Sequence, residues 1–129
     1  MTGRLATIAF LVRDYDEAIA WFTTALGFRL MEDTPLGGGK RWVRVAADGG
    51  GSALLLAKAV GDQIDGIGRQ AAGRVGFFLE VTDFDAAHAR MLAAGVHFNE
   101  APRAEPYGRV AVFTDLYGNR WDLLEAGEL

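Results

Sequence analysis

Arg109-Val-Ala-Val-Phe-Thr-Asp-Leu-Tyr-Gly-Asn-Arg-Trp-Asp-Leu-Leu-Glu125 is the stretch that decides the predicted fold. It contains two alternating apolar runs, 109–114 and 119–125, on either side of the turn Asp115-Leu-Tyr-Gly-Asn119. Apolar runs around a turn of Asp, Gly and Asn are typical of a β-hairpin. The second run holds Asp122 between Trp121 and Leu123, so this carboxylate either faces water or needs a partner inside the protein.

The rest of the chain predicts the same order of elements twice. The first module, residues 4–59, has a strand, a helix and three further strands, predicted at 4–12, 15–26, 28–32, 40–46 and 52–59. The second module, residues 74–126, repeats this order at 74–81, 84–94, 96–100, 109–114 and 119–125. Residues 60–73 contain four glycines and no clear period, which indicates a linker with room for one helical turn. Residues 35–39 and 101–108 are predicted as loops, Asp14 and Asp83 as helix N-caps, and Gly27 and Gly95 as helix ends.

The two modules also align residue by residue. Val12-Arg-Asp-Tyr-Asp16 matches Val81-Thr-Asp-Phe-Asp85 at a shift of 69 positions. Trp42-Val-Arg-Val45 matches Arg109-Val-Ala-Val112 at a shift of 67. Two diverged copies predict a pseudo-twofold arrangement within one chain rather than a long repeat array.

Composition narrows the possible functions. A chain of 129 residues suits one domain, or two small half-domains that share a core. The net charge of −4 with dispersed arginines argues against a nucleic-acid partner, and no apolar run is long enough for a membrane span. The absence of cysteine excludes disulfides and thiolate metal sites. With no secretory signal pattern at the start, a cytoplasmic location is expected.

The closing hairpin and three shorter motifs resemble the vicinal oxygen chelate superfamily, which includes glyoxalase I, extradiol dioxygenases and bleomycin- and fosfomycin-resistance proteins. The shorter motifs are Phe10-Leu-Val-Arg-Asp14, Ala18-Ile-Ala-Trp-Phe22 and Leu26-Gly-Phe28. This resemblance implies an α+β fold of two tandem βαβββ modules that form an incomplete barrel around one cavity. Family members commonly form homodimers, so a homodimer is expected as well.

The resemblance also implies where a metal would bind. Catalytic members hold one divalent metal with four residues, on the first and fourth strands of each module. The matching positions here are Thr7, Leu55, Gly76 and Asp122, of which only Asp122 is a good ligand for a divalent cation. No metal site and no cofactor are therefore predicted, although a divalent metal stays a disfavoured alternative.

Strand alternation then predicts which side chains face the cavity. If Thr7 and Gly76 face inward, Phe10 and Val12 pack on the helix together with Ile8. The inward set is mostly apolar and carries few charges, which suits a small organic ligand with one or two polar groups. Its predicted ligand contacts are Phe78 and Arg120, and its candidate catalytic acids are Glu80 and Asp122. A structural salt bridge from Asp122 to Arg44, Arg109 or Arg120 is an equally good prediction.

Two loops add further candidates. Gly37-Gly-Gly-Lys-Arg-Trp42 joins a flexible hinge to Lys40, Arg41 and Trp42, which suits closure over an anion or an aromatic ring, or else forms a solvated hairpin tip. In Pro102-Arg-Ala-Glu-Pro-Tyr-Gly-Arg109 the prolines stiffen the segment around Glu105 and Tyr107, both predicted ligand contacts.

The predicted fold and site residues are compatible with three functions. The first is metal-independent binding of a small, partly apolar molecule, including sequestration as in the bleomycin-resistance branch. The second is lyase or isomerase chemistry, with Asp122 or Glu80 as general base and Lys40, Arg41 or Tyr107 stabilising an anion. The third keeps a divalent metal bound by Asp122, Glu80 and water.

Overall fold

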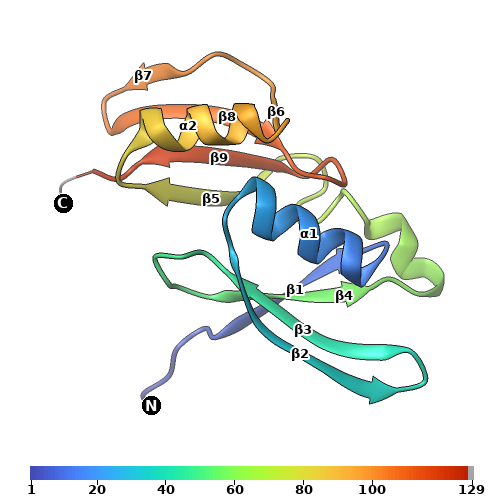
Figure 1. Cartoon of the computed structure of the whole chain (residues 1–129). Helices are drawn as coiled ribbons and strands as arrows, with labels where there is room; N and C mark the ends of the chain where they lie inside the picture. The colour runs from blue at the N-terminus through green and yellow to red at the C-terminus, as the bar shows by residue number, and fades with distance from the viewer. Residues whose placement is uncertain (128–129) are drawn as a thin grey trace. The chain divides into compact units, whose positions relative to one another are not determined.

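The computed structural model describes residues 1–127 and divides them into two compact units, with the boundary between Ile67 and Gly68. Each unit is an open sheet with one long helix, so the chain has the predicted α+β class (Figure 1). The boundary falls inside the predicted linker. No helix in residues 1–127 is long and apolar enough to cross a membrane.

The first unit has the predicted β-α-β-β-β order, followed by a short 3-10 helix in the linker. Its sheet has the strand order β1-β4-β3-β2, with β1 parallel to β4 and the other neighbours antiparallel. The elements are β1 (Thr7–Val12), α1 (Tyr15–Ala25), β2 (Arg29–Gly37), β3 (Lys40–Ala46), β4 (Ala53–Lys58) and η1 (Gly61–Gly66).

The second unit repeats this topology with one extra short strand. Its sheet has the order β5-β9-β8-β6, and β7 also pairs with β8. The elements are β5 (Val75–Val81), α2 (Phe84–Ala93), β6 (His97–Phe98), β7 (Arg103–Glu105), β8 (Gly108–Thr114) and β9 (Arg120–Glu125).

The strand register matches the internal repeat. In the first sheet Ala9 lies beside Leu55, and in the second Phe78 lies beside Asp122. Ala9 and Phe78 are 69 positions apart in the chain, and Leu55 and Asp122 are 67 positions apart, which are the two shifts between the modules. The match is interrupted at Gly76, where the register between β5 and β9 shifts.

Both long helices begin where the capping signals predict. Asp14 accepts a hydrogen bond from the Glu17 backbone N–H at 2.8 Å, and Asp83 accepts one from Ala86 at 3.1 Å. Such a bond satisfies a backbone donor that has no partner within the helix. Gly27 has a φ of 66°, a left-handed conformation that ends α1 and that glycine adopts without steric cost.

Each helix covers one face of its own sheet. In the first unit Phe22 of α1 meets Phe10 of β1 edge-on, with ring centroids 5.4 Å apart. In the second unit His88 of α2 meets Phe98 of β6 at 4.5 Å, and the aromatic cluster continues through Phe113, Trp121 and Phe77, with successive ring centroids 4.7–5.7 Å apart. The alternate residues of the same strands therefore lie on the opposite face of each sheet.

The closing hairpin is held by the buried Asp115, which is 6% exposed. Its Oδ1 accepts hydrogen bonds from the backbone N–H groups of Tyr117 at 2.9 Å and Asn119 at 3.0 Å. Its Oδ2 accepts from Asn119 Nδ2 at 3.0 Å and from the Trp121 indole at 2.9 Å. The carboxylate thus fixes the turn and joins it to the aromatic core of the second unit.

Four details of the sequence prediction were wrong. β2 does not end near Glu32 but continues to Gly37, because β3 pairs with it along that length. Residues 103–105 form β7 on the edge of β8 instead of a loop, and the strand predicted at 96–100 is only His97–Phe98. Ile8 is 40% exposed instead of packed on α1.

Candidate functional site

A cavity in the first unit begins where β3 and β4 part. The ladder between these strands consists of Arg44 with Leu55 and Val45 with Leu54. Beyond it, residues 41–43 of β3 pair with β2, while residues 56–58 of β4 pair with β1 (Figure 1). The β2–β3 hairpin therefore forms an arm separate from β4, and the cavity lies between them.

The cavity has a volume of about 600 Å³. Its walls come from the start of α1, the β2–β3 hairpin, the end of β4 and η1. The lining residues are Tyr15, Leu36, Gly38, Gly39, Lys40, Arg41, Trp42, Leu55, Leu56, Ala57, Lys58, Val60 and Gln63. Lys40, Arg41 and Trp42, predicted from the sequence as ligand contacts, are thus brought together here.

The floor of the cavity is apolar, and one indole lies in its wall. Leu55 and Ala57 are half-buried on the sheet face opposite Leu56, which is fully buried. Trp42 is 39% exposed and Leu36 is 53% exposed, which is high for large apolar side chains. Exposed apolar groups beside a concavity favour the binding of an apolar molecule because binding removes their surface from water.

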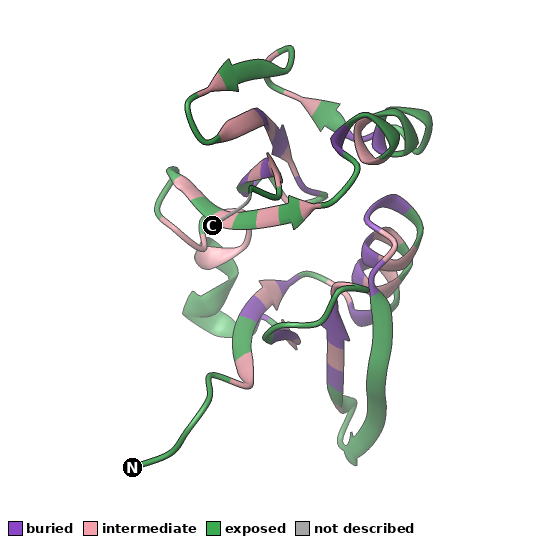
Figure 2. Cartoon of the chain, turned by 90° about the vertical axis from the view of Figure 1, so that its left-hand side faces the viewer, coloured by how far each residue is buried: buried purple, intermediate pink, exposed green. Residues whose placement is uncertain are grey.

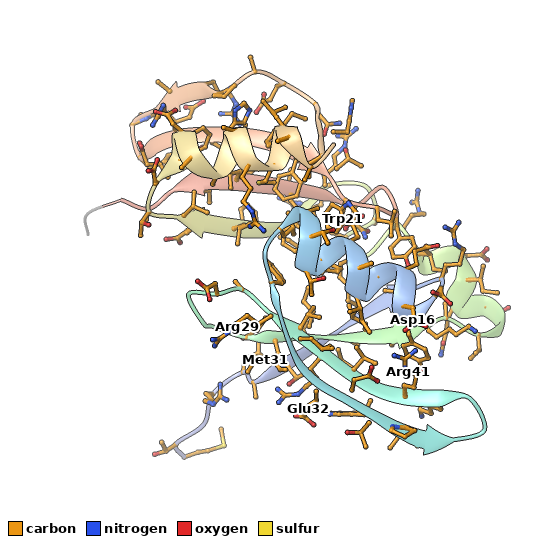
Figure 3. The ribbon with its side chains drawn as sticks, in the orientation of Figure 1. Asp16, Trp21, Arg29, Met31, Glu32 and Arg41 are labelled. Atoms are coloured by element: carbon orange, nitrogen blue, oxygen red, sulfur yellow. The ribbon has the colours of Figure 1, made fainter. Side chains whose placement is uncertain are left out.

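The hairpin wall is tied to α1 through Arg41. Its guanidinium donates to Asp33 at 2.7 Å and to Asp16 at 2.9 Å, and it lies over the Tyr15 ring, 5.1 Å from the centroid. Figure 3 shows Arg41 beside Asp16 at the start of α1. The Arg41 backbone N–H also donates to the Tyr15 hydroxyl at 3.2 Å. Four contacts thus fix the hairpin close to its tip, where Gly37, Gly38 and Gly39 all have positive φ.

The charge of Arg41 is compensated by Asp33 of the hairpin and Asp16 of α1. Its hydrogen bonds to Asp33 and then Asp16 raise the pKa of Arg41. The same hydrogen bond to Arg41 lowers the pKa of the Asp33 carboxyl. Arg41 is therefore a positioning group at this cavity, and the free cationic charge must come from other residues.

A second candidate feature lies on the face of the second sheet opposite its aromatic cluster. Asp122 of β9 has one carboxylate oxygen, Oδ1, that is buried and has no hydrogen-bond partner within residues 1–127. Burial raises the pKa of Asp122, the positive charge of Arg103 opposes this rise, and Glu100 adds to it. A buried carboxylate oxygen without a hydrogen bond can accept a proton or a hydrogen bond from a ligand.

The other predicted site residues of the second unit are spread around Asp122. Phe78 is its register neighbour on β5 and is 59% exposed, and Glu80 and Arg120 are exposed on the same face by strand alternation. Glu105 forms an ion pair with Arg103, and Tyr107 is 58% exposed beyond the end of β7.

The predicted structural salt bridge of Asp122 was wrong. Arg44 pairs with Glu32, and Arg109 pairs with Asp85 and Glu125. None of the ion pairs formed by the described residues includes Asp122 or Arg120.

The four positions expected to hold a metal do not fit one. A Cβ at Gly76 would lie 2.6 Å from Ala71 Cβ, so this position has no space for a ligating side chain. Leu55 offers no donor atom, and Thr7 Oγ1 accepts a hydrogen bond from Arg44 at 3.4 Å. No group of three or more His, Asp or Glu side chains in residues 1–127 is arranged to hold a metal ion.

Sequence reasoning missed part of the cavity. Lys58, Val60 and Gln63 line it, but the sequence shows neither where the β3–β4 ladder ends nor where η1 lies. The parting of the strands depends on long-range pairing, for which local patterns carry no signal.

Comparisons with known proteins agree with the fold. Residues 4–123 match the family described as the Glyoxalase/Bleomycin resistance protein/Dioxygenase superfamily. An uncharacterized protein from Shewanella frigidimarina is 47% identical, in an alignment that covers 99% of this chain and 97% of that protein.

Two solved structures are similar over nearly the whole chain. The crystal structure of UcmS2 has a TM-score of 0.82 and 30% identity, and the match covers 98% of this chain and all of that one. TnmS3, described as an antibiotic binding protein from Streptomyces sp. CB03234, has a TM-score of 0.76 and 28% identity, with 98% of each chain covered.

Proposed function

The chain belongs to the Glyoxalase/Bleomycin resistance protein/Dioxygenase superfamily, and from this membership we propose that it binds a small, partly apolar organic molecule in the cavity of its first unit, without a metal ion. The observation that carries the proposal is the apolar cavity of about 600 Å³ with Trp42 in its wall. Ligand pockets in proteins have volumes of roughly 300–1,000 Å³ and are mostly apolar with a few polar groups. This cavity matches that description in size and in lining.

Binding without turnover is the simplest function for such a site. TnmS3 is described as antibiotic binding, which supports sequestration in this chain as well. The poor fit of the four metal positions points in the same direction, since they lack the donors for metal-assisted chemistry.

The test is a thermal-shift screen with antibiotics, aromatic carboxylic acids and 2-oxoaldehyde adducts. We expect at least one compound to raise the unfolding temperature, because a ligand that binds only the folded state stabilises it. Trp42→Ala should remove that shift, whereas Phe78→Ala, which truncates an exposed aromatic side chain of the second unit, should leave it intact. A shift that depends on Phe78 and is unaffected at Trp42 would refute the proposed site.

Sequestration and catalysis are separated by the fate of the bound compound. After prolonged incubation and denaturation of the protein, mass spectrometry should recover the ligand unchanged. A stoichiometric excess of product would show that the protein is an enzyme.

The alternative is acid–base chemistry of the lyase or isomerase type at Asp122, with Glu80 on the same sheet face. It is supported by the buried, unpartnered Oδ1 of Asp122 and by the raised pKa of this carboxyl. A general base is effective when its pKa approaches the working pH. If a turned-over compound is found, Asp122→Asn should abolish turnover while the ligand still binds. Unchanged turnover in that variant would exclude this alternative.

We also propose a homodimer in solution. β2 is an edge strand whose nine residues are all exposed, including Leu30 at 43% and Met31 at 46% (Figures 2 and 3). Exposed edge strands with apolar side chains are ready to pair with another chain. Light scattering should give a dimer mass that Met31→Glu lowers, and a monomeric parent protein would contradict this expectation.

A further inference from the structure

The lysines of this chain are confined to one place. The sequence contains only two, Lys40 and Lys58, and both line the cavity of the first unit. Arg41 is a third cation in the wall, whereas no aspartate or glutamate of residues 1–127 lines the cavity. A protein with a net charge of −4 thus has a cavity whose own charged groups are all positive.

The two lysines supply charge that no acid compensates. Arg41 is neutralised by Asp16 and Asp33, but neither Lys40 nor Lys58 has an ion-pair partner within 4 Å among the described residues. Two ammonium groups that share one cavity repel each other, and this repulsion is relieved when an anion binds between them.

The lysines reach the cavity from its two strand walls. Lys40 begins β3, directly after the glycine tip of the hairpin, and Lys58 ends β4. Apolar surface lies between these walls, with the indole of Trp42 on the β3 side. On η1, Gln63 Oε1 accepts a hydrogen bond from the Val60 backbone N–H at 3.1 Å, which leaves the Gln63 NH₂ group to donate to a ligand.

From this arrangement we infer that the ligand is an aromatic anion, a planar ring that carries a carboxylate, sulfonate or enolate. The ring packs on Trp42 and the aliphatic floor, and the anionic group is held by Lys40 and Lys58. This inference rests on the proposed function, since it names the chemical class that the same cavity takes.

Because the chain has only two lysines, the contact of each ammonium group with the ligand can be followed by its own NMR signal. Reductive methylation with ¹³C-formaldehyde converts each amine into a dimethylamine that keeps its positive charge. The labelled protein should give two lysine signals and one from the Met1 amine, which serves as an internal reference outside the cavity. The probes are 2-naphthoate, its neutral isostere 2-naphthamide and the cationic 2-naphthylmethylamine, which share one ring system.

We expect naphthoate to shift both lysine signals and to leave the Met1 signal in place. Its affinity should exceed that of naphthamide by about tenfold or more, because charge-assisted hydrogen bonds are stronger than neutral ones. The preference should fall as salt is added, because salt screens exposed charges.

Variants distinguish this pair of lysines from the overall charge of the protein. Lys40→Met/Lys58→Met should bind naphthoate and naphthamide equally. Arg4→Met/Arg74→Met, which removes the same charge from exposed positions outside the cavity, should keep the preference for the acid.

The outcomes separate this inference from the proposed function. If naphthamide or the amine binds as tightly as the acid in a manner that requires Trp42, the anionic class is wrong and the proposed function stands. If none of the three probes binds at about 1 mM and the screen also finds no ligand, both proposals fail. If naphthoate binds but only the Met1 signal moves, the lysines do not hold the anion.

Discussion

Asp115→Ala should destabilise the protein more than any other single carboxylate truncation in the closing hairpin. The substitution removes four accepted hydrogen bonds of 2.9–3.0 Å and leaves Asn119 Nδ2 and the Trp121 indole N–H buried without an acceptor. Each buried donor left without a partner costs roughly 1–3 kcal/mol. The two side-chain donors, together with the loosened turn, give an expected loss of about 4 kcal/mol in the free energy of unfolding.

A matched substitution refines this magnitude. Asp115→Asn keeps Oδ1 as an acceptor for the two backbone N–H groups but replaces Oδ2 with a donor facing two donors, so we expect about half the loss. Asp48→Ala removes a carboxylate that is 83% exposed and 3.9 Å from Arg29, and it should change stability by less than about 0.5 kcal/mol.

The assay is urea unfolding followed by far-ultraviolet circular dichroism and, separately, by tryptophan fluorescence. A loss below about 1 kcal/mol in Asp115→Ala would contradict this prediction, because the carboxylate would then not organise the hairpin. If Asp115→Asn lost as much free energy of unfolding as Asp115→Ala, the hydrogen bonds to Oδ1 would contribute nothing to stability.

Three further predictions concern the candidate site. Gly76→Ala should destabilise the protein by about 1–3 kcal/mol because its new Cβ has no space. Gly49→Ala, whose new Cβ would meet nothing within 4 Å, should leave stability unchanged. Equal melting temperatures for the two variants would contradict this prediction. The raised pKa of Asp122 means that the folded state holds this proton more tightly than the unfolded state, so its contribution to stability falls as pH rises above the ordinary value of 3.8. Asp122→Asn should abolish that part of the slope in urea titrations across the acid range, and an unchanged slope would assign it to other groups. Arg41→Met should speed amide hydrogen exchange in residues 33–41 because it breaks the ion pairs that hold the hairpin. Arg13→Met, which breaks the more exposed pair with Glu17, should leave that exchange unchanged. Slow exchange in both variants would show that the hairpin does not depend on Arg41.

Local signals in the sequence predicted much of the fold. Asp14 and Asp83 correctly predicted where both helices begin, because an N-cap hydrogen bond joins residues only three positions apart. The turn at Asp115 predicted the closing hairpin, because its hydrogen bonds also join residues that are close in the sequence. The repeat predicted that Leu55 and Asp122 occupy equivalent positions, and the structure places both on a strand parallel to the first strand of their unit, beside Ala9 and Phe78.

Long-range pairing was the part that the sequence did not reveal. β2 was predicted too short and β7 was missed, because each is extended only through contacts with β3 or β8. The cavity depends on the end of the β3–β4 ladder, so Lys58 could not be assigned to it from local pattern. The sequence did indicate Lys40, Arg41 and Trp42, which line this cavity, because a glycine hinge followed by two cations and an indole is a recognisable local combination.

Trp42 offers the most direct test of binding in the first unit. The chain has three tryptophans, so a ¹⁵N-edited spectrum should contain three indole N–H signals, which Trp→Phe variants assign to Trp21, Trp42 and Trp121. A ligand from the screen should shift the Trp42 signal in proportion to its saturation and leave the Trp121 signal, from the core of the second unit, in place. A saturable ligand that moves Trp121 and leaves Trp42 unchanged would contradict binding in the cavity between β3 and β4.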